Sequence, residues 1–489
     1  MSPDFILPAV NFQCILPQIL LCLTALAVLL VDVFGMVKKS SALALIALGG
    51  SVFATLTLFS GTGVQGSAFS GMILADGFTL FCNLIIFLIL ILTILVSMNY
   101  QQFFGNINSG EYYSLLIFAA VGMSFMAAAG NLILLFVALE LMSVSIYVLV
   151  GFHKDTLRSI EAALKYFLLG AFATSFLLFG FAFLYGATGT MDLLIMTEFI
   201  RGHPEILGSG MFLAGVLLTF TGLGFKISMV PFHMWTPDVY EGAPTVITGF
   251  MATGVKAAAF AALVRIFMVP LGTLPIDWSM VVWVAAVLTM TVGNIIALVQ
   301  ESIKRMLAYS GIAHAGYLLI GVVAGGQLAQ AGILYYLLVY AFMNIGAFGV
   351  LALLGKKETE YNTLDDFRGL GLKYPILGLA MAVFMFSLAG IPPTGGFMGK
   401  LYIFSAAIKS GYIWLVVLGA VNSVVSIFYY LRVIVRMYFT DAPNEATAFP
   451  SPSPAITVGL GLAAAGIMIL GVFPSYFWVL AQNSVFMPM

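Results

Sequence analysis

The chain has 489 residues, of which 62% are hydrophobic and only 8% are charged, and its formal net charge is -1. Soluble domains carry about 25% charged residues, so this composition excludes an ordinary soluble protein and indicates a polytopic membrane protein. The nearly neutral charge also argues against nucleic acid as a partner.

Long apolar runs recur along the sequence, and we interpret them as about fourteen transmembrane helices of roughly 20 residues each, the length that crosses the hydrocarbon core. The N-terminal residues MSPDFILP lack the basic region of a cleaved signal peptide, so we expect the first run to be retained. The seventh and twelfth runs contain internal prolines, which break helices. The predicted spans are 14–35, 41–60, 75–98, 112–128, 131–151, 160–186, 210–240 (broken), 244–268, 279–299, 303–322, 329–354, 375–409 (broken), 411–437 and 456–481.

Lysine and arginine residues favour alternate connections between these spans. Cytoplasmic loops carry an excess of basic residues, so the bias predicts that both termini face the outer, periplasmic side of a bacterial inner membrane. A missed helix would destroy the alternation, which therefore supports the even number of spans. The odd-numbered connections hold twelve basic residues, Lys38, Lys39, Lys154, Arg158, Lys304, Arg305, Lys356, Lys357, Arg368, Lys373, Arg432 and Arg436, and the even-numbered connections and their flanks hold three, Arg201, Arg265 and Lys409.

The fifth and sixth spans each carry a notable charged residue. Glu140 lies nine residues past Asn131, roughly 13 Å along a helix, with no basic neighbour in sequence. A charge at mid-bilayer costs about 2.5–3.5 kcal/mol on insertion scales, so the expected partner of Glu140 is a lysine on a nearby helix. A protonated, hydrogen-bonded structural glutamate is the alternative. Lys165 lies about one turn inside the sixth span, where its ammonium can snorkel to the interface.

The stretch Phe225–Thr245 is the most informative in the sequence. Lys226 follows an apolar segment with no acid within ten residues, and Pro231 and Pro237 break the helix after it. In lipid such a break survives only where protein or a water-filled cavity satisfies the freed carbonyls. An intramembrane lysine beside it is a functional-site hypothesis, and a snorkelling lysine at a helix end is the alternative. His233, in the same stretch, is either a relay member or an interfacial residue.

The eighth, tenth and twelfth spans add further titratable residues. Lys256 lies twelve residues past Pro244, roughly 18 Å along a helix, among small residues that let another helix or water approach. Desolvation favours the neutral form of a lysine and a nearby carboxylate favours the charged form, so a lysine between the two can pass protons on. His314, about eleven residues into the tenth span, is a relay residue or a satisfied core histidine. Lys304, at the cytoplasmic start of that span, is a helix-end residue or a gate for proton entry, and Lys400 follows the break in the twelfth span.

A weak internal repeat relates the two halves of the sequence. The offset between Lys226 and Lys400 is 174 residues, and the same offset takes Glu140 to His314, unless the three positions coincide by chance. Spans four to eight and nine to thirteen then form two five-helix units of opposite orientation, an architecture of transporters. The predicted domains are three N-terminal helices in 1–111, the first repeat in 112–268, the second repeat in 279–440 and a C-terminal helix in 456–489.

Other motifs exclude several functions. GTGVQG at Gly61–Gly66 follows a membrane helix and not a strand, so we interpret it as a loop and not as a dinucleotide site. No GxxxxGK[ST] sequence occurs, so ATP is not the energy source. Cys14, Cys22 and Cys82 form no CxxC pair and predict neither a structural zinc site nor an iron–sulfur cluster, and no group of residues has metal-ligand spacing. The charged run KKETEYNTLDDFRGLGLKYP is a solvated loop and at most a partner surface.

Several segments resemble the antiporter-like membrane subunits of the proton-pumping NADH–quinone oxidoreductase, complex I. The likeness covers nearly the whole chain and rests on GNLILLFVALELMSVSIYVLVGF, RSIEAALKYFLLGAFATSFLLFG, GFKISMVPFHMWTPDVYEGAPT, SIKRMLAYSGIAHAGYLL and LAGIPPTGGFMGK. Within that family, the chain is most similar to the subunit N branch, which includes mitochondrial subunit 2, in three features. They are the start ILPQILLCLTALAVLLVDVF, Lys400 where subunit M typically has a glutamate, and an end after the fourteenth span without the lateral helix of subunit L.

The resemblance implies fourteen transmembrane helices with two inverted five-helix repeats, and proton translocation driven by electron transfer in other subunits. It implies no cofactor in this chain, because flavin, iron–sulfur clusters and quinone belong to partner subunits. The expected partners are other membrane-arm subunits, especially M and K, and lipids. The residues that it assigns to the proton relay are Glu140, Lys226, Lys256 and Lys400, with supporting roles for Lys165 and His314.

Two other functions stay open at this point. A subunit of a multi-component sodium/proton antiporter shares the repeat and its charged residues, and composition does not separate it from the pump subunit. A non-conducting scaffold would tolerate neutralisation of all four relay residues without loss of transport. Co-purification separates the pump subunit from the antiporter subunit. A complex with flavin and iron–sulfur signals indicates the pump, and one without redox centres indicates the antiporter.

Overall fold

The computed structural model describes residues 11–36, 40–60, 66–104, 109–271, 279–354, 363–441 and 452–486. Within these ranges the chain is almost entirely helical, with one short hairpin, and twelve helices are long and apolar enough to cross a membrane. The predicted all-α membrane fold is therefore confirmed. The predictions for residues 1–10, for most of the GTGVQG loop and for Lys38, Lys39, Lys356 and Lys357 concern residues outside the described ranges.

The N-terminal part of the chain forms four long helices and the hairpin, whose strands pair antiparallel with Gly66 opposite Ala75. Buried polar contacts join the helices. Gln18 Nε2 donates to Ser124 Oγ (2.8 Å), which donates to Asn83 Oδ1 (2.8 Å), and such interhelical hydrogen bonds hold helices together in lipid. The elements are a 3₁₀ turn (Phe12–Ile15), α1 (Leu16–Val33), α2 (Ser40–Ser60), β1 (Gly66–Ala68), β2 (Ile73–Ala75), α3 (Gly77–Phe104) and α4 (Ser109–Ala128).

The next part of the chain contains the predicted spans five to eight. α5 begins after Asn131, whose Oδ1 accepts a hydrogen bond from Ile133 N (2.8 Å). No predicted span covers α7, a helix of ten residues that Asp192 caps by accepting a hydrogen bond from Leu194 N (2.9 Å). The elements are α5 (Leu132–Val150), α6 (Leu157–Thr188), α7 (Leu193–Gly202), a 3₁₀ turn (Pro204–Gly208), α8 (Gly210–Lys226), α9 (Trp235–Gly242), α10 (Thr245–Phe250), a π-helical turn (Met251–Val255) and α11 (Lys256–Met268).

The second half of the chain contains the remaining predicted spans. The expected break in the twelfth span lies between α16 and α17. The prediction of one continuous last helix over 456–481 is wrong, because α19 ends at Val472 and Pro474 begins a separate α20; proline lacks a backbone donor and clashes with the preceding turn. The elements are α12 (Ser279–Leu298), α13 (Ile303–Ala324), α14 (Gly326–Leu354), a 3₁₀ turn (Asp365–Phe367), α15 (Leu370–Lys373), α16 (Pro375–Ala389), α17 (Gly395–Lys409), α18 (Ile413–Tyr438), α19 (Pro454–Val472) and α20 (Pro474–Asn483).

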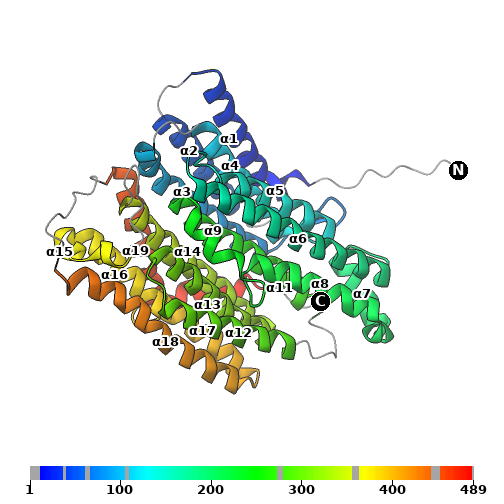
Figure 1. The fold of residues 1–489 in the computed structure, drawn as a ribbon. Helices are drawn as coiled ribbons and strands as arrows, with labels where there is room; N and C mark the ends of the chain where they lie inside the picture. Colours follow the sequence, from blue (N-terminus) through cyan, green and yellow to red (C-terminus); the bar gives the residue numbers. More distant parts are fainter. Residues whose placement is uncertain are drawn as a thin grey trace.

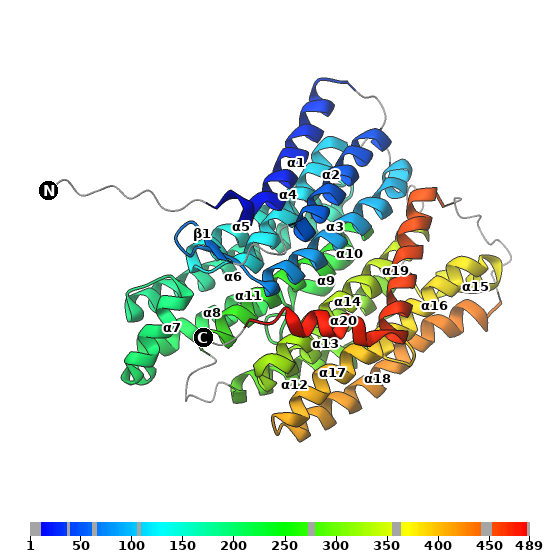
Figure 2. The ribbon, with the colours of Figure 1, turned by 180° about the vertical axis from the view of Figure 1, so that it is seen from behind.

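The helices form one elongated bundle. Figure 1 shows α1–α4 at one end of the molecule and α12, α17 and α18 toward the other. α14 lies between these groups and packs against α3, α10, α16, α17 and α19. From behind, α20 crosses the long helices at a steep angle and packs against α14 (Figure 2). α14 and the segment Thr245–Met268 are buried almost completely, because other helices surround them.

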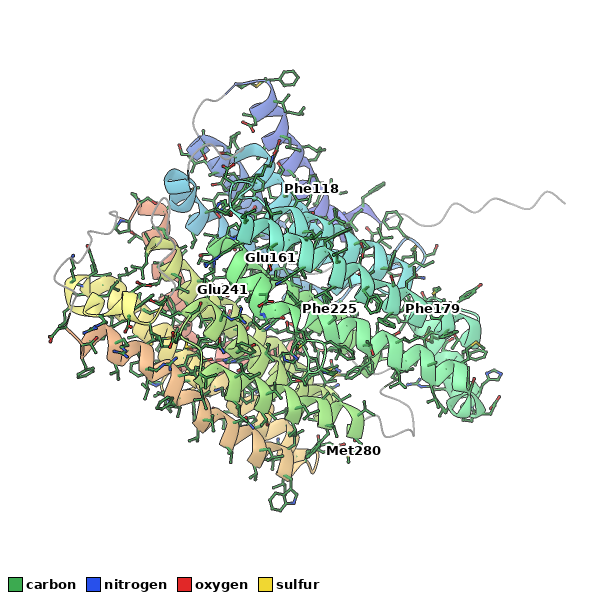
Figure 3. The ribbon with its side chains drawn as sticks, viewed as in Figure 1. Phe118, Glu161, Phe179, Phe225, Glu241 and Met280 are labelled. Carbon is green, nitrogen blue, oxygen red and sulfur yellow. The ribbon has the colours of Figure 1, made fainter. Side chains whose placement is uncertain are left out.

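The outer helices expose apolar side chains. Phe179 on α6 and Met280 on α12 are 59% and 62% exposed and lie near the edge of the molecule in Figure 3. Such a surface suits contact with lipid or with other membrane subunits. By contrast, Glu161, Glu241 and Phe225 lie near its middle, on α6, α9 and α8. The labelled charged residues thus lie near the middle of the bundle, away from its apolar ends.

Candidate functional site

The break between α8 and α9 frees backbone groups that nearby side chains satisfy. Trp235 Nε1 donates to the carbonyl of Phe225 (3.0 Å), near the end of α8. Ser228 adopts a left-handed conformation (φ 63°), and its Oγ accepts a hydrogen bond from Thr236 Oγ1 (2.8 Å). The protein thus supplies hydrogen-bond partners that lipid cannot offer. The helix break beside Lys226 is therefore stabilised by the surrounding structure.

Lys226 is the last residue of α8, and it is buried (1% exposed) against α5 and α6. Its Nζ donates to Ser143 Oγ (2.9 Å) and, at longer range, to Tyr147 Oη (3.4 Å). Nζ also lies 5.6 Å from the ring centroid of Tyr147 and 5.7 Å from that of Tyr166, within the distance at which ring faces attract a cation. These partners are all neutral, so they stabilise an ammonium without fixing its charge.

Glu140 lies one turn before Ser143 on α5, so Glu140, Ser143 and Tyr147 share one face of that helix. Within the part of the chain that the structure describes, no ion pair joins Glu140 to Lys226, and Glu140 Oε1 is buried without a hydrogen-bond partner. The structure therefore places the predicted pair at one site but does not join its members directly. Ser143, one turn from Glu140 on α5, instead accepts a hydrogen bond from Lys226 Nζ.

Lys256 is the first residue of α11, directly after the π-helical turn, and it is 1% exposed. Each extra residue rotates an α-helix by about 100°, so the wider turn decides which way this side chain points. Its Nζ donates to the carbonyl of Gly311 on α13 (2.5 Å). Lys256 thus connects the first predicted repeat to the second.

Lys400 lies inside α17, after the second break, and is 5% exposed. Its Nζ reaches back to the carbonyls of Ala389 (3.0 Å) and Leu388 (3.3 Å) at the end of α16, and it donates to Ser423 Oγ (2.8 Å). A cation is favoured at a helix C-terminus, where unpaired carbonyls carry a partial negative charge. Gly390, the next residue, has φ 82°, which glycine adopts without strain.

His314 on α13 is 1% exposed and has a tyrosine at each ring nitrogen. Its Nδ1 lies 2.6 Å from Tyr336 Oη, and its Nε2 lies 3.0 Å from Tyr430 Oη. Tyr430 Oη also makes a short contact with Ser310 Oγ. The histidine is therefore one member of a buried chain of hydroxyl groups between Lys256 and Lys400. The tyrosines were not among the predicted site residues, because a buried tyrosine has no sequence signal that separates it from core.

The three other predicted residues occupy different surroundings. Lys165 is 42% exposed at its side chain and pairs with Glu161 Oε1 (2.7 Å). His233 is buried, with Nδ1 lacking a hydrogen-bond partner within the described ranges. Lys304 is fully buried and donates to the carbonyl of Ala243 (2.8 Å), at the end of α9. These residues surround the second half of the broken helix and not the chain of buried lysines.

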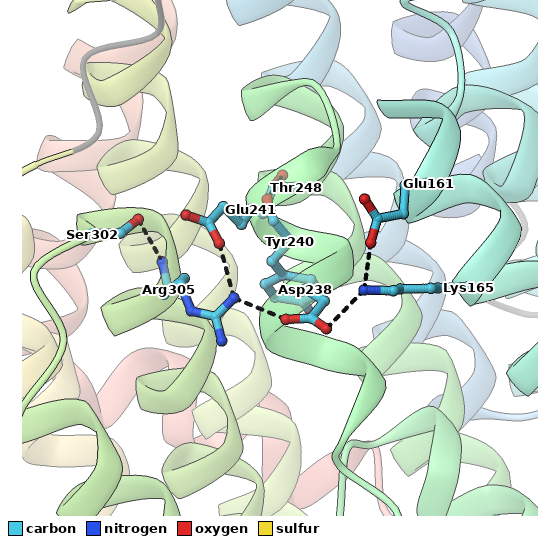
Figure 4. Close-up of polar contacts among 8 residues, drawn as sticks. All are labelled: Glu161, Lys165, Asp238, Tyr240, Glu241, Thr248, Ser302 and Arg305. Atoms are coloured by element: carbon cyan, nitrogen blue, oxygen red, sulfur yellow. Dashed lines mark hydrogen bonds and ion pairs between the residues drawn. The ribbon is translucent and has the colours of Figure 1, made fainter. Parts of the chain in front are cut away.

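A charged network surrounds α9 (Figure 4), and it was not predicted from the sequence. Asp238 Oδ2 accepts from Lys165 (3.2 Å) and its Oδ1 from Arg305 Nη1 (2.9 Å), which also donates to Glu241 Oε2 (2.8 Å). The acids belong to the first half of the chain and Arg305 to the second. A pairing over so many residues leaves no local pattern, although two acids three residues apart on one helix face are a partial signal.

A cavity of about 220 Å³ opens beside this network. Its polar lining distinguishes it from the apolar surroundings of the membrane helices. Across the described ranges, no group of three or more histidine, cysteine, aspartate or glutamate side chains is placed to hold a metal ion. The residues that line the cavity are Arg158, Glu161, Ala162, Lys165, Asp238, Glu241 and Gly242.

Arg265 forms a second unpredicted ion pair. The sequence places it beside an even-numbered connection, but the structure buries it in α11 (2% exposed). Its Nη2 lies 2.7 Å from Asp76 Oδ1 and its Nη1 lies 3.0 Å from Asp76 Oδ2, in a bidentate pair. This pair ties α11 to the segment before α3, because a paired carboxylate offsets the cost of burying a guanidinium.

Comparison with known proteins gives consistent results. The sequence model of the family described as NADH:quinone oxidoreductase/Mrp antiporter, TM, matches residues 129–426. A protein of Trichlorobacter lovleyi named NADH-quinone oxidoreductase subunit N is 48% identical over 97% of both chains, and one of the same name from Chloroflexus aggregans is 43% identical over 98% of both.

Solved structures agree with the sequence comparison. A chain of respiratory complex I from Thermus thermophilus has a TM-score of 0.80 and 34% identity over 95% of this chain and 99% of its own length. A chain of the archaeal membrane-bound sulfane sulfur reductase has a TM-score of 0.84 at 26% identity over 96% of both chains. A chain of the Mrp complex of Dietzia, at 18% identity and a TM-score of 0.80 over 97% of both chains, shares the fold.

Proposed function

The chain belongs to the NADH:quinone oxidoreductase/Mrp antiporter family of membrane subunits, in its NADH-quinone oxidoreductase subunit N group, and we propose that Glu140, Lys226, Lys256, His314 and Lys400 carry its protons. The complex is a proton-translocating NADH:quinone oxidoreductase, and this chain is an antiporter-like part of its membrane arm. The relatives' names favour this reading over a sodium/proton antiporter subunit.

The proposal rests on the hydrogen-bond partners of the three buried lysines. Lys226, Lys256 and Lys400 are 1%, 1% and 5% exposed, and every hydrogen bond described for their ammonium groups goes to a hydroxyl or a carbonyl. Water-depleted surroundings disfavour a charged lysine, and neutral acceptors only partly offset that cost. Such lysines can release and regain a proton, whereas lysines locked to a carboxylate hold it.

We infer that each residue has a separate role. Glu140 biases Lys226 by its charge, and its contribution grows when the two approach and falls when they separate. A proton released by Lys226 passes to Lys256, whose ammonium contacts α13 of the second half. From there it reaches His314 and then Lys400, which lies beside the break at α16. The broken helices give water access to the chain of residues from opposite sides.

The proposal extends to the partners and the orientation of the chain. We place it beside subunits M and K, with lipids around the exposed apolar helices. Flavin, iron–sulfur clusters and quinone belong to the partner subunits. Both termini lie on the periplasmic side, as the basic residues suggest. A cysteine at Asp365, whose side chain is 72% exposed, should resist labelling from outside intact cells in a cysteine-free background, and labelling there would reverse the orientation.

The test of the proposed function is Lys256→Ala in the assembled complex. We expect NADH-driven proton uptake by inverted membrane vesicles to be lost while flavin and iron–sulfur content stay normal. Lys409→Ala is the matched control, because Lys409 is an exposed lysine at the end of α17. Normal pumping by fully assembled Lys256→Ala would remove Lys256 from the pathway.

A further inference from the structure

Tyr340 on α14 lies between Lys256 and His314. Lys256 Nζ is 5.9 Å from the centroid of the Tyr340 ring, and the rings of Tyr340 and His314 have centroids 5.3 Å apart. Lys256 and His314 belong to different predicted repeats, on α11 and α13. Tyr340 therefore lies close to both residues and can take part in a proton transfer between them.

The hydroxyl of Tyr340 is available for such a transfer. Tyr340 is 1% exposed, and among the described residues its Oη has no hydrogen-bond partner. One turn further along α14, Asn344 Oδ1 is also buried without a partner. An unpaired buried polar atom costs about 1–3 kcal/mol, so two of them on adjacent turns of one helix call for an explanation. Neighbouring Tyr335 has no such feature, because its hydroxyl donates to the carbonyl of Leu470 (2.5 Å).

Gly311 sets the space between the two groups. A Cβ at Gly311 would lie 2.7 Å from Lys256 Nζ and 3.1 Å from Tyr340 Oη. Both polar atoms therefore face the same point above Gly311, where the absence of a side chain leaves room for them to interact. Glycine here is not required by the backbone, because Gly311 lies within α13 and is not among the positive-φ residues. The geometry points to a functional reason for the small residue.

We propose that the Tyr340 hydroxyl is a relay residue that passes the proton between Lys256 and His314. The inference rests on the proton pathway proposed above. The Lys256 ammonium gives an N–H proton to a lone pair of Tyr340 Oη, directly or through one water. The original Tyr340 O–H proton passes through one further water to Tyr430, because no hydrogen bond joins these two described hydroxyl groups directly. The Tyr430 hydroxyl gives its own proton to His314 Nε2, 3.0 Å away. Lys256 ends neutral and His314 ends as imidazolium, and both tyrosines keep one proton each.

A purely structural role predicts the opposite order of effects from a relay role. Tyr340→Phe removes a hydroxyl that has no hydrogen bond of normal geometry and interacts only with the Asn344 side chain, so it should weaken the fold little. Tyr335→Phe removes a hydroxyl on the same buried helix that does have one. The structural reading therefore ranks Tyr335→Phe as the more harmful change, and the relay reading ranks Tyr340→Phe as the more harmful.

The experiment compares Tyr340→Phe, Tyr335→Phe and Lys256→Ala in the assembled complex, as NADH-driven proton uptake by inverted membrane vesicles in H₂O and D₂O. Tyr340→Phe should lower the pumping rate by about tenfold, less than a single rate-limiting proton-transfer group contributes, because several steps share the transfer. Its solvent isotope effect should rise above that of the unchanged complex. Tyr335→Phe should pump nearly normally with an unchanged isotope effect.

The outcomes separate the inference from the proposed function. If Lys256→Ala abolishes pumping and Tyr340→Phe behaves like Tyr335→Phe, Tyr340 is not a relay residue and the pathway stands. If Lys256→Ala pumps normally, the pathway itself is wrong. Gly311→Ala decides the matter should Tyr340→Phe fail to assemble, because it fills the shared space and keeps the hydroxyl. Normal pumping by Gly311→Ala would then overturn the inference.

Discussion

The two broken helices hold their lysines in different ways. Lys226 ends the first half-helix, α8, and points at hydroxyl groups and aromatic rings of its neighbours. Lys400 lies within the second half-helix, α17, and reaches back to the carbonyl end of α16. The 174-residue offset aligns the two lysines in sequence, but they lie on opposite sides of their breaks. The two breaks thus hold a buried lysine with different local structure, and Lys400 has a helix-stabilising role that Lys226 lacks.

The residues that control the two lysines also differ. In the first half, the acid Glu140 lies one turn from Ser143, which accepts a hydrogen bond from Lys226. The corresponding position in the second half is His314, which two tyrosines hold at Nδ1 and Nε2. We infer that the first half responds to a fixed nearby charge, and that the second half passes protons through neutral groups. The predictions below test this asymmetry.

The largest effect is expected from removing either lysine. Lys226→Met and Lys400→Met should each lower NADH-driven pumping by about 100-fold, since a titratable group in the pathway is lost. Only Lys400→Met should also reduce thermal stability, by about 1–2 kcal/mol, because the carbonyls of Leu388 and Ala389 lose their cationic partner. Pumping and thermal unfolding of the detergent-solubilised complex are the two measurements. Equal loss of stability in both variants would show that the two sites are alike.

The second-largest effect is expected from changing Glu140, the acid of the first half. Glu140→Gln should impair pumping more than Glu140→Asp, because the aspartate keeps the charge that acts on Lys226. Glu140→Gln combined with Lys226→Met should recover complex yield but not activity, since no titratable lysine remains there. The three variants and the unchanged complex are compared for complex yield and proton uptake in vesicles. Pumping by Glu140→Gln at the unchanged rate would mean that the acid does not control Lys226.

A smaller effect is expected at the backbone of the breaks. Both breaks contain a left-handed residue, Ser228 (φ 63°) in the first and Gly390 (φ 82°) in the second. Gly390→Ala should destabilise the complex by about 1–2 kcal/mol, because a Cβ is unfavourable in this conformation and would lie 3.0 Å from Lys400 Nζ. Ser228→Ala keeps its conformation and loses only the hydrogen bond from Thr236, so it should cost less. Thermal unfolding of the two variants gives the order, and the reverse order would contradict this account.

The sequence predicted the fold class well, for a physical reason. A long apolar run has few alternatives to a membrane helix, and an isolated charge within one, such as Lys256, is conspicuous. The partners of these charges were not predictable. Ser143, Tyr336 and Tyr430 come from helices distant in sequence, and their contacts depend on packing that no local pattern records.

The structure of the two helix breaks was also only partly predictable from the sequence. Pro231 marked the interruption after Lys226, but proline does not reveal where each half-helix ends or which side chain caps it. The π-helical turn before Lys256 has no proline and was not predicted. Pro474 does mark the end of α19, but the apolar run continues past that residue and hides the boundary.

The smallest effect is expected at the charged network around α9, which joins the halves outside the chain of buried lysines. Asp238 is shared by Lys165 and Arg305, and its side chain is 43% exposed, so solvent weakens each pair. Exposed ion pairs contribute about 0–1 kcal/mol, and Asp238→Asn should shift thermal unfolding of the complex accordingly. The shift should shrink at high salt, because ions screen exposed charges over roughly 10 Å or less. Glu161→Gln, which leaves the contact between the halves intact, is the control and should shift unfolding less. A large, salt-independent loss of pumping in Asp238→Asn would instead place Asp238 in the proton pathway. The difference between the two broken helices would then include α9, the half-helix that follows the first break.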